Sequence, residues 1–175
     1  MNKTMIAGAL AVVLASFGAQ AANQGSGVIN FKGSVIDTPC GIAPASADQS
    51  IDFGQISKVF LEANGTSVKK NLDIELVNCD ATALGKTGSV KVSFAGNTIN
   101  GQTQELGTTG DTGTAVVISA SNGTLVSFDG TAGDAVKLKE GNNLLRYSAW
   151  VKKATGQTLK EGDFSTVANF NLTYE

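Results

Sequence analysis

Two cysteines, Cys40 and Cys79, are the residues of this chain with the widest chemical range. Such a pair can form a disulfide, share a metal ion or supply a catalytic thiolate. The chain has no histidine, which removes the commonest general base and the commonest metal ligand. In an exported protein the pair usually forms a disulfide, so we expect Cys40–Cys79, with a metal pair or a catalytic thiol as the alternative. Closing a loop of about 40 residues would stabilise the fold by roughly 4 kcal/mol in the chain-entropy model.

Two short matches to penicillin-binding enzymes do not amount to an active site. Ser67 and Lys70 fit the motif S-x-x-K, and residues 86–88 (KTG) fit K-T-G. The third motif, S-D-N, does not occur between them, and the chain is too rich in strand patterns for that α/β fold. Lysines at strand ends and in loops explain both matches. The sequence therefore predicts no catalytic residue, no cofactor and no metal site.

The first 21 residues have the pattern of a secretory signal peptide. Lys3 lies ahead of the apolar run MIAGALAVVLASF over 5–17, and an A-x-A site follows at Ala19-Gln20-Ala21. The run is too short for a stable membrane span. A buried core helix is the alternative reading of this run. We expect cleavage after Ala21, and no later segment is apolar enough to insert into a membrane.

Composition and charge narrow the class of protein further. The net charge is −2, or −3 once Lys3 is removed, so the chain offers no basic surface for a nucleic-acid partner. It contains 21 glycines but only 2 prolines, and its apolar runs alternate between Gly and Asn turns. This pattern favours an all-β domain.

Nine segments have strand patterns, and one has a weak helical pattern. The polar, Gly-rich residues 101–113 read as a surface loop, and residues 58–63 as a turn or two of helix. Short strands with frequent turns suggest one β-sandwich with Greek-key links. The expected strands are residues 28–36, 50–53, 72–77, 89–94, 114–119, 125–128, 135–138, 143–152 and 164–174.

The two ends of the mature chain look complementary. In the last expected strand Ala168, Phe170, Leu172 and Tyr174 share an apolar face, and no later strand follows that could cover it. Residues 22–38 begin with a polar tail and continue into another strand pattern with an apolar face. Periodicity alone allows the two to pair within one chain, as in a complete sandwich, or between chains.

Several stretches resemble the major pilin subunits of the chaperone–usher pathway of Gram-negative bacteria. The resemblance is closest to rod subunits of P pili and looser to type 1 fimbrial subunits, and it covers nearly the whole mature chain. The combination of a cysteine behind an F-x-G-x-V strand with a penultimate tyrosine is specific. The stretches that carry it are VINFKGSVIDTPC (28–40), SADQSIDFGQISKVFLEANG (46–65), LDIELVNCD (72–80), TGTAVV (112–117), GNNLLRYSAWVKK (141–153) and VANFNLTYE (167–175).

The resemblance implies an incomplete immunoglobulin-like Greek-key β-sandwich that lacks its seventh strand. It implies a signal peptide over 1–21, a donor-strand extension over 22–38 and a pilin domain over 39–175. A periplasmic chaperone would first lend a strand to the groove. At an outer-membrane usher the extension of the next identical subunit would replace it, which is β-strand addition used for polymerisation. The product would be a surface fimbria that supports adhesion and carries tip or adaptor subunits.

The same resemblance assigns roles to individual residues. Ile29, Phe31 and Val35 would be the apolar knobs of the donor strand, and Gly33 its glycine at the shallow part of the groove. Gly162, Tyr174 and Glu175 would belong to the groove and chaperone-recognition strand, together with Ala168, Phe170 and Leu172. Glu175 would supply the terminal carboxylate that the chaperone grips, in a position often occupied by glutamine.

Two other functions fit a chain of this class. One is a minor, adaptor or adhesive pilus subunit, although the mature chain has no room for a separate lectin domain. The other is a free-standing secreted carbohydrate-binding sandwich, which usually needs exposed aromatic side chains. The chain has 1 Trp and 2 Tyr. We expect Trp150 to lie in the core because its neighbours Ala149 and Val151 belong to an expected central strand.

Overall fold

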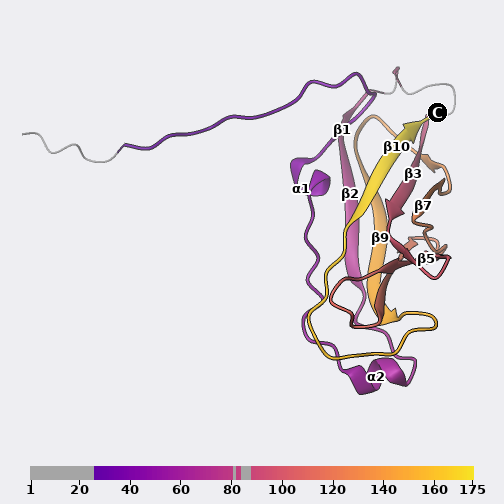
Figure 1. Cartoon of the computed structure of the whole chain (residues 1–175). Coiled ribbons are helices and arrows are strands. Elements are labelled where there is room, and N and C mark those ends of the chain that lie inside the picture. Colours follow the sequence, from indigo (N-terminus) through magenta and orange to yellow (C-terminus); the bar gives the residue numbers. More distant parts are fainter. Residues whose placement is uncertain (1–25, 81, 84–87) are drawn as a thin grey trace, which may run out of the picture. The chain divides into compact units, whose positions relative to one another are not determined.

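The computed structural model describes residues 26–80, 82–83 and 88–175 (Figure 1). The expected signal peptide over 1–21 lies outside the described residues. The chain divides into two units, Met1–Val35 and Ile36–Glu175. Within the described part, no helix is long and apolar enough to cross a bilayer.

The described part of the first unit, residues 26–35, forms neither helix nor strand. Its apolar side chains are exposed, and that of Phe31 is 90% exposed. The strand expected over 28–36 is therefore not formed in this chain. A strand needs a partner for its backbone groups, and an alternating pattern alone cannot provide one.

The second unit is a sandwich of two antiparallel sheets that face each other (Figure 1). The first sheet has the order β1-β2-β9-β6-β5-β4, and the second has the order β10-β3-β7, with β8 also paired to β3. The elements are β1 (Gly41–Ile42), α1 (Pro44–Ala47), α2 (Lys58–Glu62), β2 (Lys70–Cys79), β3 (Ser89–Gly96), β4 (Thr98–Ile99), β5 (Gln102–Gly107), β6 (Thr114–Ala120), β7 (Asp129–Ala132), β8 (Val136–Lys137), β9 (Gly141–Lys153) and β10 (Ala168–Tyr174).

The core lies between the sheets and follows from alternation along their strands. Alternate residues in the middle of β2 and β3 are buried, namely Ile74 and Leu76 in β2 and Val90, Val92 and Phe94 in β3. The strand β9 holds the first sheet together, because it pairs with β2 from Gly141 to Ala149 and with β6 from Tyr147 to Lys153.

The predicted disulfide is confirmed. Cys40 and Cys79 are bonded, and both are fully buried. The bond lies where β1 pairs with the end of β2, and the amide of Asp80 donates to the carbonyl of Pro39 at 2.9 Å. The start of the second unit is thus fixed to β2.

Most of the expected strands are present, but some expectations were wrong. Residues 101–113 include β5, whose Leu106 is buried and pairs with Val116 of β6. This strand was missed because its polar sequence lacks β-branched residues apart from one threonine. Residues 50–53 and 125–128 form no strand, and the last strand begins at Ala168. The weak helical pattern corresponds to α2, whereas α1 was not expected.

The expectation that Trp150 lies in the core was wrong. Ala149 and Val151 are buried, so Trp150 between them points to the opposite face of the sheet. The indole is half-buried, and the ammonium of Lys69 lies 4.5 Å from its ring centroid, as in a cation–π contact.

Candidate functional site

The strand β10 has a partner on one edge only. It pairs with β3 in an unbroken antiparallel register from Ala168↔Gly96 to Tyr174↔Val90. Among the described residues no strand pairs with its other edge. The backbone groups on that edge are those that an added strand would bind.

The apolar face of β10 is also incompletely covered. Val90, Val92 and Phe94 of β3 are at most 3% exposed. Their neighbours on β10 are only half-buried, although they pack against the same core: these are Ala168, Phe170, Leu172 and Tyr174. Burial raises the pKa of the Tyr174 hydroxyl. Four of the predicted groove residues, Ala168, Phe170, Leu172 and Tyr174, therefore form one row beside the open edge.

A groove of about 560 Å³ lies next to the first two residues of this row, Ala168 and Phe170. Its floor reaches into the core, because Ile74 of β2, Phe94 of β3 and Ile118 of β6 all line it. Residues 166–170 form one wall, and Ile42 and Phe53 lie on the other. An apolar side chain entering here would contact both sheets of the sandwich.

Side-chain hydrogen bonds, rather than a backbone ladder, hold the segment next to this second wall against the edge of β2. The hydroxyl of Ser46 accepts from the amide of Glu75 at 2.9 Å. The amide group of Gln49 donates to the carbonyl of Asp73 at 2.9 Å. These contacts satisfy the edge of β2 without a continuous ladder, so residues 48–53 pass by the core without closing it. Sequence reasoning missed Ser46 and Gln49, since neither lies in a strand pattern.

Loops hold the start of β10 in place. The hydroxyl of Thr166 donates to the carbonyl of Gly107 at 2.7 Å, and the amide of Thr109 donates to the carbonyl of Ser165 at 2.8 Å. Gly162 lies in this region with φ +149°, next to Thr112. It lines a neighbouring cavity of about 800 Å³ rather than the groove, although the two share Ile51 and Phe53.

The other end of β10 is fixed to β3. Glu175 exchanges two backbone hydrogen bonds with Ser89, of 2.9 and 3.1 Å. The Glu175 side chain forms an ion pair with Lys91 at 2.7 Å. This ion pair neutralises the charge of the Glu175 side chain.

The predicted donor residues lie in the first unit. Ile29, Phe31 and Val35 are exposed, and no other atom lies within 4 Å of the position a Cβ would take on Gly33. Their segment has no strand partner within its described residues.

The groove is suited to binding an apolar segment. Asp48 is the one ionisable side chain among the described residues that line it. In the described part of the chain no three His, Cys, Asp or Glu side chains are grouped as a metal site would require. A single carboxylate provides no acid–base pair.

Comparison with known proteins agrees with this geometry. A family model described as "Fimbrial protein" matches residues 29–175. The chain is 53% identical to the Pap fimbrial major pilin protein of Escherichia coli over the full length of both chains. It is 40% identical to the fimbria A protein of Serratia marcescens, covering 100% of this chain and 99% of that one.

Two solved structures are similar in fold. One is the crystal structure of the P pilus rod subunit PapA, with a TM-score of 0.75 and 56% identity over 79% of this chain and 100% of that chain. The other comes from a study of rod uncoiling in a chaperone–usher pilus, with a TM-score of 0.81 and 54% identity over 87% of this chain and 97% of that chain. These similarities confirm the predicted incomplete immunoglobulin-like sandwich.

Proposed function

Because the chain belongs to the fimbrial protein family and is a structural subunit rather than an enzyme, we propose that it polymerises by donor-strand exchange. Residues 28–36 of one copy would fill the groove beside β10 of the next copy and pair with its open edge. The observation that carries the proposal is the half-buried row Ala168, Phe170, Leu172 and Tyr174 next to an edge without a partner.

The spacing of the donor residues supports this fit. Ile29, Phe31, Gly33 and Val35 occupy four alternate positions, as do the four residues of the row on β10. Side chains on one face of a strand recur about every 6.8 Å, so the two sets have the same repeat. Gly33 would lie where the groove is too shallow for a side chain.

The expected interaction is strong and slow to break. Burying three apolar knobs at about 1.5–3 kcal/mol each gives roughly 5–9 kcal/mol. Ladder hydrogen bonds add about 0.5–1.5 kcal/mol each. Release would uncover the core of the acceptor, so dissociation should be kinetically controlled. Head-to-tail pairing of this kind does not close on itself and yields a filament.

The route to the fibre is part of the proposal. Residues 1–21 would direct export and be removed, 22–38 would serve as the donor extension, and 39–175 would form the pilin domain. A periplasmic chaperone would cover the groove until an outer-membrane usher exchanges it for the next subunit. Without such cover the apolar groove and the bare edge should cause aggregation. Gly162 and Glu175 remain candidates for chaperone recognition.

The test is a denaturing gel of material sheared from the surface of the cells. One half of the sample is left unheated, and the other half is boiled in acid. A ladder of multimers that collapses to one band near the mature mass is the expected result. Phe31→Asp should abolish the ladder, because it places a charge on a donor knob. The control is Ser34→Asp, which changes the opposite face of the same strand. A monomer band without heating would reject donor-strand exchange and favour a self-complete binding module.

A further inference from the structure

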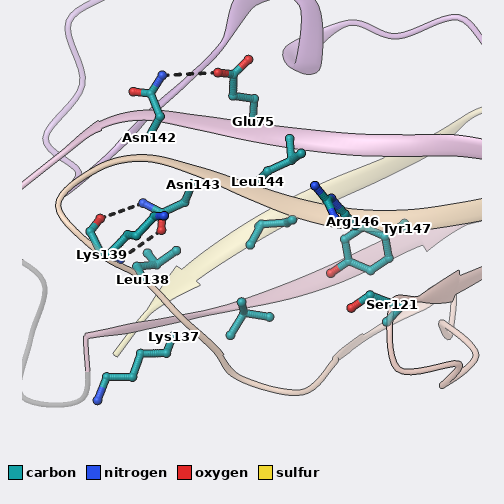
Figure 2. Close-up of a pocket in the computed structure, with 13 residues that line it drawn as sticks. Glu75, Ser121, Lys137, Leu138, Lys139, Asn142, Asn143, Leu144, Arg146 and Tyr147 are labelled. Carbon is teal, nitrogen blue, oxygen red and sulfur yellow. Dashed lines mark hydrogen bonds between the residues drawn. The ribbon is translucent and has the colours of Figure 1, made fainter.

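Among the described residues, no strand pairs with one edge of the first part of β9. The pairing of β6 with β9 ends at Tyr147, whereas β2 continues to Gly141 on the other side. In the opposite sheet β8 pairs with the start of β3. A hollow of about 940 Å³, lined by β8 and the unpaired part of β9, opens here (Figure 2).

Most of the lining of this hollow is apolar. Leu138 and Leu145 are buried, but Val136 is 40% exposed and Tyr147 is half-buried. Figure 2 shows the ring of Tyr147 on the same side as Ser121, which comes from the turn after β6. Exposed apolar side chains that line a concave site of this volume are typical of ligand binding.

The opening of the hollow is basic. Lys137, Lys139 and Arg146 line it, and none of them forms an ion pair within the described residues. Lys137 extends away from the other labelled side chains in Figure 2. Glu75 is the one carboxylate in the lining, and it accepts from Asn142 at 3.4 Å. This local excess of positive charge contrasts with the net charge of −2 of the chain.

Charge distinguishes this hollow from the groove beside β10. Both are apolar, but the groove carries only Asp48, whereas the hollow carries three cations against one carboxylate. An apolar molecule with a negative group would be repelled at the first site and attracted at the second. No residue lines both sites, so occupation of one leaves the other open.

We propose that the hollow beside β9 binds an anionic amphiphile. The ligand would have an apolar body of steroid or medium-chain acyl size and one carboxylate or sulfonate group. Its body would contact Val136, Leu138 and Tyr147, and its charged group would lie at the opening, between Lys139 and Arg146. This function goes beyond polymerisation and does not depend on it, because the hollow lies outside the groove.

The test uses cholate as the probe, titrated below its micellar concentration into purified fibres sheared from the cell surface, and followed by calorimetry. We expect saturable binding with one site per chain. The double variant Lys139→Gln/Arg146→Gln should weaken it about tenfold, as two exposed ionic contacts allow. The matched control Lys70→Gln/Lys153→Gln removes the same charge elsewhere and should change the dissociation constant less than twofold. Absence of binding, or equal weakening in both variants, would overturn the proposal.

A second variant separates loss of the site from loss of the fold. Ser121→Trp should block the hollow from the turn after β6 without changing any charge, so it should abolish cholate binding while the thermal melting curve stays unchanged. The neutral detergent octyl glucoside should bind much more weakly than cholate, and equal binding would contradict the role of the cations. A gel of the same samples tests donor-strand exchange separately.

Discussion

Phe170 lies directly opposite Phe94 in the ladder of β10 and β3, and the two rings are 6.4 Å apart. Phe94 is 3% exposed, whereas Phe170 is only half-buried. The two side chains share one core, so the difference comes from what lies on their outer sides. Within the part of the chain that the structure describes, Phe94 has a neighbouring strand on each side and Phe170 on one side only.

Replacing Phe170 should weaken the polymer. Phe170→Ser removes an apolar contact worth about 1.5–3 kcal/mol from the wall of the groove. We expect the unheated ladder to collapse at a lower temperature than that of the unmodified protein. Asn171→Ser, on the exposed face of the same strand, serves as the control. Identical collapse temperatures for both variants would argue against insertion beside β10.

Removing the disulfide should destabilise the domain. We expect Cys40→Ser/Cys79→Ser to lower the free energy of unfolding by about 2–5 kcal/mol, because the 39-residue connection is no longer closed. Denaturant titration with and without a reductant measures this effect. The reductant should lower the midpoint of the unmodified protein and leave that of the variant unchanged. Equal midpoints for the two oxidised proteins would show that the bond contributes no stability.

Two glycines with the same backbone angle should respond differently to alanine. Gly110 and Gly123 both have φ +86°. A Cβ on Gly123 meets nothing within 4 Å, but one on Gly110 would clash with the carbonyl oxygen of Asp163 in the loop before β10. Gly123→Ala should cost about 1–2 kcal/mol from backbone strain alone. Gly110→Ala should cost distinctly more and shift the loop that positions β10. Unfolding free energies measure the comparison, and equal costs would contradict it.

Glu105 should make the stability depend on pH. Glu105 is 6% exposed, and its carboxylate binds the ammonium of Lys152 at 2.7 Å and the amide and hydroxyl of Thr155 at 2.8 and 2.6 Å. Burial raises the pKa of Glu105, but these hydrogen bonds together outweigh burial and hold the pKa below its usual value of 4.5. The contribution of this carboxylate to stability is therefore complete above the unfolded-state pKa. It is lost as the pH falls through the lower folded-state pKa.

The variant Glu105→Gln tests this dependence. It should lower the free energy of unfolding at neutral pH by about 1–3 kcal/mol, since charge-assisted hydrogen bonds are lost. It should also reduce the decline in stability between roughly pH 5 and pH 3. Glu161→Gln, at an exposed position, is the control and should change neither quantity appreciably. A decline of unchanged steepness in the Glu105 variant would contradict the assignment.

The sequence predicted the features that depend on local periodicity or on a rare residue type. Alternation identified β2, β3, β9 and most of β10, and the two cysteines predicted their own bond. The groove was predicted only through family resemblance, because its far wall depends on Ser46 and Gln49 binding the edge of a strand some 25 residues away. Such side-chain contacts leave no periodic pattern. The strand β5 was missed for a related reason, since it is specified by its neighbours rather than by its composition.

The disulfide also has a mechanical consequence. Tension applied to the domain through residues 36–39 arrives at Cys40, and the covalent bond transfers it to Cys79 at the end of β2. The strand β2 is bound along its length to β9. A pull along the strands would therefore load this ladder in shear, with its hydrogen bonds sharing the force. The two-residue strand β1 would be spared, and the forced-unfolding rate would be set by the longest pairing in the domain.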